Sequence, residues 1–312
     1  MFGKNSDEKI DGKDLKRYFE SGPPVCGGTD SYRDQKAPKE IVSKDMTLFE
    51  AGTSLFTLVL PPDKDSSSRL WYISAYAAYA DKGSFVYLSK STECRGPAKS
   101  SWALVKRDVL PDLVRLVDEA DLARSNGCHS TTHGLPEDFG GRVFIKYASG
   151  ESISFSNNQS PIIAYDTCVR MADLFESFMG EERVALKDLS GLKEIRFLEE
   201  RDNGGFTKAI LAFNADGTGT NRKSMRFDGP TVYESEKPVD AETMSKIKSV
   251  IERCGMLAWS GLPDSGFPKI SKKSMSFVFD DGETFTAEDG KELPYAIGNG
   301  FFAIELEVTT KH

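Results

Sequence analysis

Two stretches, LPDLVRLVDEA (Leu110–Ala120) and MSKIKSVIERC (Met244–Cys254), repeat one apolar pattern 134 residues apart. Apolar residues occupy the first, fourth, seventh, eighth and eleventh positions of both stretches, which is the spacing of one helix face. The matched positions are Leu110 and Met244, Leu113 and Ile247, Leu116 and Val250, Val117 and Ile251, and Ala120 and Cys254. We therefore expect one amphipathic helix in each half of the chain.

Turn residues around the two helices also recur in a common order. Gly83 matches Gly217 at the same offset, and further glycines and prolines match at offsets of 127 to 133 residues. These further matches are Gly96-Pro97 with Gly229-Pro230, Gly134-Leu135-Pro136 with Gly261-Leu262-Pro263, Gly150 with Gly282, and Pro161 with Pro294. The offset of 127, against 134, leaves seven additional residues after the first helix. Short turn motifs also match by chance, but the common order favours a tandem duplication.

Composition narrows the class of protein without identifying its function. The chain has 312 residues, of which 39% are hydrophobic and 28% charged, as expected for a soluble globular protein. A net charge of −8 argues against a nucleic-acid binder and is compatible with a basic protein partner. No apolar run is long enough to span a membrane, the five cysteines do not suggest a disulfide framework, and no leader peptide is evident. These features predict a cytoplasmic location without membrane contact.

The pattern of strands and turns predicts an α+β fold made of two tandem repeats. Tight turns such as Asp81-Lys82-Gly83 and Asp216-Gly217 join neighbouring strands, which must then be antiparallel. Each repeat is expected to be an antiparallel sheet with a helix packed on one face. Residues 1–45 form a polar, partly irregular segment, with a short helix around Leu15, Tyr18 and Phe19. Residues 46–180 form repeat one with a closing helix, and residues 181–312 form repeat two, which ends in a strand over residues 301–308.

The second half contains Trp259-Ser260-Gly261 after its helix, then the hairpin Phe277–Gly282 and, in the tail, Pro294. In this order of elements the sequence resembles a tandem α+β module of uncharacterised proteins of Firmicutes. The resemblance extends over most of the chain after about residue 46, although repeat one has no counterpart of Trp259. It implies no catalytic residues and no cofactor, because the family has no assigned activity.

One local cluster, Cys128, His129 and His133, offers side chains that could carry chemistry. It lies in the additional residues of repeat one, which we expect to form a loop. Thiolate and imidazole groups are zinc ligands, and three of them would leave one position open for water. A cysteine beside a histidine could also act as a nucleophile. The spacing matches no established zinc motif, so an ordinary polar loop is the competing interpretation.

An aromatic-rich strand in repeat one offers a candidate interaction surface. Trp71, Ile73, Ala75, Ala77 and Tyr79 share one face by alternation, and Tyr72 and Tyr76 share the other. If the odd-numbered face is the core, Tyr72 and Tyr76 are exposed and could contact a partner. Core packing on both faces is the alternative.

These observations favour a non-enzymatic protein-interaction or binding module over an enzyme. One alternative is a hydrolase or metal-site protein that uses the Cys128/His129/His133 segment. Another is a small-molecule binding protein with its pocket between the repeats. The sequence does not identify a partner, a ligand or an oligomeric state.

Overall fold

A computed structural model describes residues 15–20, 29–55, 69–93, 96–134, 140–227, 229–264 and 271–309. The chain divides into two compact units. The first comprises Met1–Tyr79 and Gly83–Arg183, and the second comprises Ala80–Lys82 and Val184–His312. The predicted boundary after residue 180 is close to the boundary observed after Arg183.

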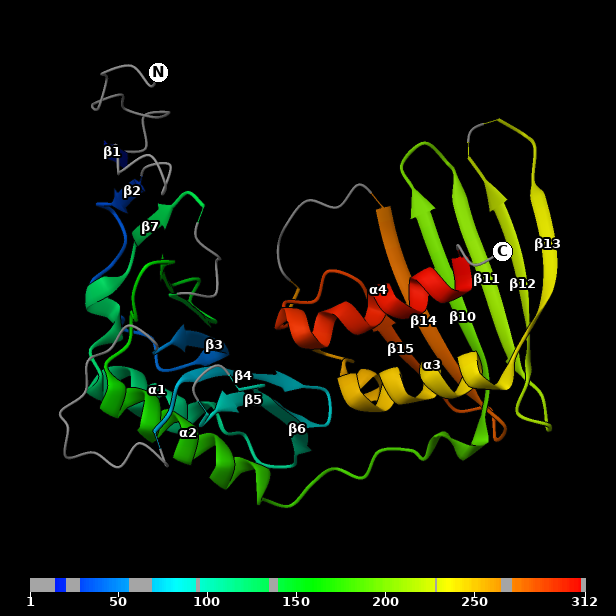
Figure 1. The fold of residues 1–312 in the computed structure, drawn as a ribbon, viewed down its shortest axis with the longest axis horizontal. Helices are drawn as coiled ribbons and strands as arrows, with labels where there is room; N and C mark the ends of the chain where they lie inside the picture. Colours follow the sequence, from blue (N-terminus) through cyan, green and yellow to red (C-terminus); the bar gives the residue numbers. More distant parts are fainter. Residues whose placement is uncertain are drawn as a thin grey trace. The chain divides into compact units, whose positions relative to one another are not determined.

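The first unit contains a sheet in the strand order β1-β2-β7-β9-β8-β3-β4-β5-β6 (Figure 1). Most neighbouring strands are antiparallel, whereas β7 and β9 are parallel. The elements are β1 Leu15–Glu20, β2 Thr29–Asp34, β3 Met46–Ser54, β4 Tyr72–Ala80, β5 Gly83–Ser91, β6 Lys99–Val105, α1 Leu110–Glu119, β7 Cys128–Thr132, β8 Gly141–Tyr147, β9 Ser152–Asn157 and α2 Tyr165–Met179.

Helices α1 and α2 cover one face of the first sheet and bury its main core. Leu113 and Val117 of α1 and Phe175 of α2 pack against alternate residues of the strands, among them Phe49 and Ile145. The helix α1 begins with a proline at its first turn, and the Asp108 carboxylate accepts the N–H of Leu110 at 3.0 Å. These signals fix the start of the helix, so its apolar stripe meets the sheet.

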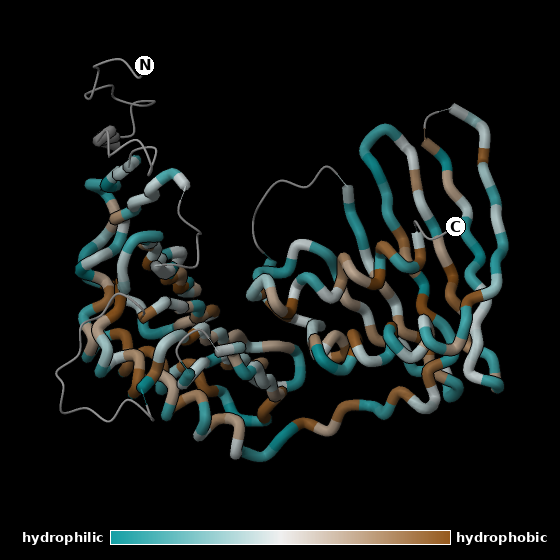
Figure 2. The backbone as a smooth tube through the Cα atoms, viewed as in Figure 1, coloured by the Kyte–Doolittle hydropathy of each residue, from teal (hydrophilic) through white to brown (hydrophobic). Residues whose placement is uncertain are grey.

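The second unit contains a sheet in the order β13-β12-β11-β10-β14-β15, with α3 and α4 packed on it. Its elements are β10 Leu192–Arg201, β11 Phe206–Phe213, β12 Gly219–Arg226, β13 Tyr233–Val239, α3 Ala241–Cys254, β14 Ser271–Phe279, β15 Thr284–Glu288 and α4 Tyr295–Thr309. Hydrophilic residues gather at the tip of the hairpin that joins β10 and β11 (Figure 2). Gly255 ends α3 in a left-handed conformation with φ 62°, and the Trp259 ring N–H donates to the Cys254 carbonyl at 3.0 Å.

The two units share one sequence of elements and one strand order. Each has four strands, a helix, a hairpin and a closing helix, apart from the additional strands β1, β2 and β7 of the first unit. The order β9-β8-β3-β4-β5-β6 in the first sheet matches β15-β14-β10-β11-β12-β13 in the second. The fold class is therefore mixed α+β, with four α-helices and two largely antiparallel sheets among the described residues.

Three sequence-based expectations about local structure are wrong. Residues 301–308 belong to helix α4 and not to a strand, because a helix that is apolar on two sides can imitate strand alternation. The segment around Leu15 is strand β1, paired with β2, so tertiary pairing overrides its local helical spacing. The additional residues after α1 do not form a loop, since Cys128–Thr132 is strand β7 between β2 and β9.

None of the helices within the described residues is long and apolar enough to cross a membrane.

Candidate functional site

A row of polar residues crosses six strands of the first sheet on the face opposite α1 and α2, which we call the open face. Strand register places its members side by side in the order Tyr32, His129, Ser156, Arg142, Gly52 and Ser74. The residues next to them in the chain, such as Val143, Ala51 and Ile73, belong to the core beneath the helices. Side chains alternate along a strand, so this polar row faces away from the core.

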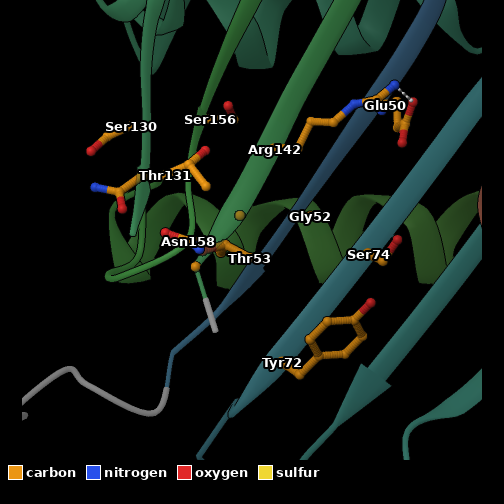
Figure 3. Close-up of a pocket in the computed structure, with 13 residues that line it drawn as sticks. Glu50, Gly52, Thr53, Tyr72, Ser74, Ser130, Thr131, Arg142, Ser156 and Asn158 are labelled. Carbon is orange, nitrogen blue, oxygen red and sulfur yellow. Dashed lines mark hydrogen bonds and ion pairs between the residues drawn. The ribbon is translucent and has the colours of Figure 1, made fainter. Parts of the chain in front are cut away.

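A hollow of about 400 Å³ lies on the open face, around Gly52. Tyr72 and Ser74 lie on one side of Gly52, and Ser130, Thr131 and Ser156 lie on the other (Figure 3). Gly52 brings no side chain into the hollow. A Cβ at position 141 would overlap the carbonyl oxygen of Gly52, so glycine at 141 lets β8 lie close against β3.

An ion pair borders the hollow. Arg142 Nη2 lies 3.0 Å from Glu50 Oε2, and the two side chains are 58% and 19% exposed. The Arg142 guanidinium also lies 5.5 Å from the centre of the Phe144 ring. Arg142 is the exposed partner of this pair, so a ligand that offers a carboxylate can reach its guanidinium while Glu50 stays in place.

Two buried asparagines hydrogen-bond to the backbone in this part of the first unit, one of them at the end of the added strand β7. Asn158 accepts the Thr132 N–H at 2.7 Å and donates to the Thr132 carbonyl at 2.9 Å, which fixes the end of β7. Asn126 donates to the carbonyls of Pro38 and Ser152 and accepts the N–H of Ser154. Both residues are buried. A buried amide that is hydrogen-bonded to the backbone holds that backbone in place.

His129 lies on β7, where the added strands meet the rest of the sheet, between Tyr32 of β2 and Ser156 of β9. Its Nδ1 lies 2.9 Å from Ser156 Oγ, and its ring stacks on Tyr32 with centroids 4.7 Å apart and planes 15° apart. Burial lowers the pKa of His129, although the charge of Asp34 opposes this shift. The same two causes, burial first and then Asp34, raise the pKa of the Tyr32 hydroxyl. At neutral pH the imidazole is therefore uncharged, as a hydrogen-bond acceptor or a base would need to be.

The predicted cluster of Cys128, His129 and His133 is dispersed. Cys128 packs against the core beneath the helices, whereas His129 faces the hydroxyl of Ser156 on the open face. His133 pairs with Asp30 at 3.0 Å. The described part of the chain contains no group of three or more His, Cys, Asp or Glu residues that could hold a metal ion. Adjacency in the sequence failed here because neighbouring residues of a strand point to opposite faces.

The two candidate interaction tyrosines have different environments. Tyr72 lines the hollow and is half-buried. Tyr76 is wholly buried, with its ring 6.3 Å from that of Phe85, which in turn stacks on Trp102 at 5.7 Å. The prediction that Tyr76 is exposed is therefore wrong, and the alternative of core packing on both faces of β4 holds at this position.

No pattern in the sequence singles out Glu50, Arg142, Ser156 or Asn158. Only the register of the strands brings them together, and register depends on long-range pairing that spacing in one segment does not reveal. One local signal was present: Gly140 and Gly141 stand directly before a strand, and paired glycines there indicate that another backbone segment lies close to that strand.

No protein-family model matches the chain, and no curated protein matches it either. The resemblance to the module of Firmicutes proteins therefore stays a prediction.

Proposed function

We propose that the protein is a non-enzymatic binding module that holds a polar segment of a partner protein on the open face of its first sheet. The hollow around Gly52, bordered by the Glu50–Arg142 ion pair, carries this proposal. Hydroxyl and amide groups line it from several strands, and the polar row continues from it to Tyr32. Such a surface offers many hydrogen bonds and one exposed guanidinium to a ligand.

A protein segment fits this surface better than a compact small molecule. Small-molecule pockets usually enclose most of their ligand and are lined mainly by apolar side chains. Most of the residues that line the hollow are polar, and Ser74, Ser130, Thr131 and Ser156 supply hydroxyl groups. The alternative of a small-molecule pocket between the two repeats stays a prediction.

The accessible charge at the hollow favours an acidic group in the partner. Arg142 is three times as exposed as Glu50, at 58% against 19%, so an incoming carboxylate can take the guanidinium in a bidentate geometry. The net charge of −8 led us to predict a basic partner. That prediction concerns the acidic surface of the whole protein and not this hollow, and it stays a prediction.

The proposal is tested by capture from a lysate of the source organism with the wild type, Arg142→Ala and Arg170→Ala. Arg170 is a matched control, because it is a 49% exposed arginine in an ion pair with Glu119 and lies on α2. We expect one stoichiometric partner with the wild type and with Arg170→Ala, and its loss with Arg142→Ala. Equal capture by all three proteins would exclude the open face as the binding surface.

A hydrolase is the second candidate, in a form different from the one predicted. The 2.9 Å contact between Ser156 Oγ and His129 Nδ1, with an imidazole kept neutral by burial, places a hydroxyl beside a base. Ser156, and not Cys128, is then the nucleophile. Hydrolysis of activated esters by the wild type and its loss in Ser156→Ala would support this candidate. An unchanged rate in Ser156→Ala would exclude it.

We further propose that the two units descend from one duplicated module, as the sequence pattern predicted. The matching strand order and the matching helix stripes support this proposal. In an experimentally determined structure we expect β3–α2 to superpose on β10–α4, with Leu113 at the place of Ile247. A superposition that requires a different pairing of strands would contradict common descent.

A further inference from the structure

Helix α4 is apolar on two opposite sides. One side faces its sheet and α3 and buries Ile297, Gly300, Phe301, Ile304 and Val308. The other side exposes a stripe of four residues, Tyr295, Asn299, Phe302 and Leu306, and hydrophobic residues recur along the whole helix (Figure 2). Tyr295 is 83% exposed, Phe302 58% and Leu306 42%. A helix that is hydrophobic all round is normally covered on all sides.

The closing helix of the first unit, α2, shows which residues occupy the corresponding outward side when that side faces water. The buried positions of α2 and α4 align at an offset of 129 residues, for example Cys168 with Ile297 and Phe175 with Ile304. At that offset the exposed positions of α2 that correspond to the stripe are Asp166, Arg170, Asp173 and Ser177. The stripe of α4 thus replaces charged and polar residues with a tyrosine, an amide, a phenylalanine and a leucine.

The spacing of the stripe matches the seam of a two-stranded coiled coil. Its members are separated by four, three and four residues, as a and d positions are in a heptad. Tyr295 and Phe302 fall at d positions, and Asn299 and Leu306 fall at a positions. A single asparagine at an a position favours two strands and fixes their register. The pattern therefore suits a second helix of the same kind.

The flanks of the stripe permit close approach of an identical helix. Ala296 and Ala303 flank it on one side, and Gly298 and Glu305 on the other. Small flanking residues let two helix backbones approach closely. Glu305 is the only charged residue at these flanking positions, and Lys273 of the same copy neutralises it at 2.7 Å. A face that meets itself across a two-fold axis must avoid like charges, and this face does.

We propose that the protein forms a homodimer in which the stripe of α4 packs on the stripe of α4 in a second copy. The helix has 15 residues and is about 22 Å long, so the interface is small. We expect reversible dimers with a dissociation constant on the order of micromolar, because interfaces of this size are weak. The dimer is independent of the ligand proposed for the open face of the first sheet.

Sedimentation velocity over a series of concentrations tests the dimer with the wild type, Phe302→Asp and Phe227→Asp. Phe227 is a matched control, since it is a phenylalanine 52% exposed elsewhere in the second unit. We expect concentration-dependent dimers for the wild type and for Phe227→Asp, and a monomer for Phe302→Asp at every concentration. Circular dichroism checks that Phe302→Asp keeps its helices.

Two outcomes would overturn the proposal. One is a wild type that stays monomeric at all concentrations, which would mean that no second copy covers the stripe. The other is a dimer that persists in Phe302→Asp with unchanged affinity, which would place the interface elsewhere. A folded Phe302→Asp monomer beside a dimeric Phe227→Asp supports the stripe as the contact.

Discussion

The two units of this protein build the same order of six strands and two helices, and they differ in what each adds to it. The first sheet continues past β9 with β7, β2 and β1, whereas the second ends at β15. The first unit closes with α2, whose outward side is charged and polar, and the second with α4, whose outward side is largely apolar. Most of the candidate hollow lies on strands that both units have, with β7 adding Ser130 and Thr131 to its lining, and the proposed dimer contact lies on a helix that both units have. The units therefore differ in the side chains and edge strands placed on one shared scaffold.

The largest effect is expected where the two units are most alike, in the buried side of the closing helices. Phe175 of α2 and Ile304 of α4 are buried at corresponding positions, and Phe175 contacts Phe49 and Phe178 with ring centroids 5.8 and 5.4 Å apart. Truncation leaves a cavity, so Phe175→Ala should cost about 3–5 kcal/mol and Ile304→Ala about 2–5 kcal/mol. Hydrogen exchange measured by mass spectrometry assigns each loss of stability to its unit.

If Phe175→Ala or Ile304→Ala left hydrogen exchange in its own unit unchanged, the correspondence between the two helices would fail. An exposed position on the same helix serves as the control for each variant. Asp173→Ala on α2 changes the outward side only, and Asn299→Ala on α4 does the same when it is measured below the dissociation constant of the dimer. Surface substitutions of this kind usually change stability by less than about 0.5 kcal/mol.

The sequence could predict those features of the two units that depend on local patterns of residues. The stripes of α1 and α3 are visible in the spacing of Leu113, Val117, Ile247 and Ile251, and all four residues are buried. The α+β class follows from these helices and the tight turns between strands. The sequence pattern predicted a strand in place of helix α4. Phe301 and Phe302 lie on different sides of this helix and are both apolar, so the apolar spacing of the segment also fits a strand.

The candidate site could not be predicted, because its members meet only through strand pairing. Ser156 reaches His129 through the pairing of β9 with β7, and Arg142 reaches Gly52 through the pairing of β8 with β3. These pairings join residues far apart in the chain. The sequence identified Tyr72 and His129 as candidates by residue type, but it could not show which face either residue would share with the others.

The next largest effect should distinguish the added strands of the first sheet from its shared part. Asn158→Ala removes both hydrogen bonds to the backbone of Thr132 and leaves a buried N–H and a buried carbonyl without partners. Each such group costs about 1–3 kcal/mol, or about 2–6 kcal/mol for the two together. We expect a loss in the lower half of that range, because water can enter the space that the amide leaves. Hydrogen exchange should accelerate in β7 and β2 before it does in β3 or β8. Uniform acceleration over the first sheet would show that the added strands are not a separate part.

A smaller loss of stability is expected when a hydrogen bond that only the second unit has, at the end of α3, is removed. The ring N–H of the buried Trp259 donates to the Cys254 carbonyl, which lies at the end of α3. Trp259→Phe keeps an aromatic ring but removes this bond, and we expect a loss of about 1–2 kcal/mol. Chemical denaturation followed by circular dichroism gives the change. Trp102→Phe, at a ring contact in the first unit, is the comparison. A larger loss in Trp102→Phe would show that the bond at Cys254 adds little.

The pH dependence of stability should differ between the units, because the half-buried His129 belongs to the first. Burial lowers the pKa of His129 in the folded protein below its value of about 6.5 in the unfolded chain. The unfolded chain therefore binds more protons as the pH falls below about 6.5, and folding loses stability over that interval. Above it both states are neutral and the contribution is constant. Denaturation at pH 5.5 and 7.5, both about one unit from 6.5, should show the loss in the wild type and a smaller loss in His129→Gln. An identical pH dependence in both proteins would contradict the assignment to His129.

The smallest effect should come from the position where the two closing helices differ most. Phe302→Asp gives α4 the residue that α2 carries at the corresponding position, Asp173. Phe302 is 58% exposed, so in the monomer the exchange should change the free energy of unfolding by no more than about 0.5 kcal/mol. Denaturation at concentrations below the dissociation constant of the dimer measures this value.

A small change in the free energy of unfolding, together with loss of the dimer at higher concentration, would show that the Phe302 side chain serves association and not folding. A loss of about 2 kcal/mol or more in the monomer would instead mean that Phe302 is covered within its own chain, and the difference between α2 and α4 would then concern packing within the molecule.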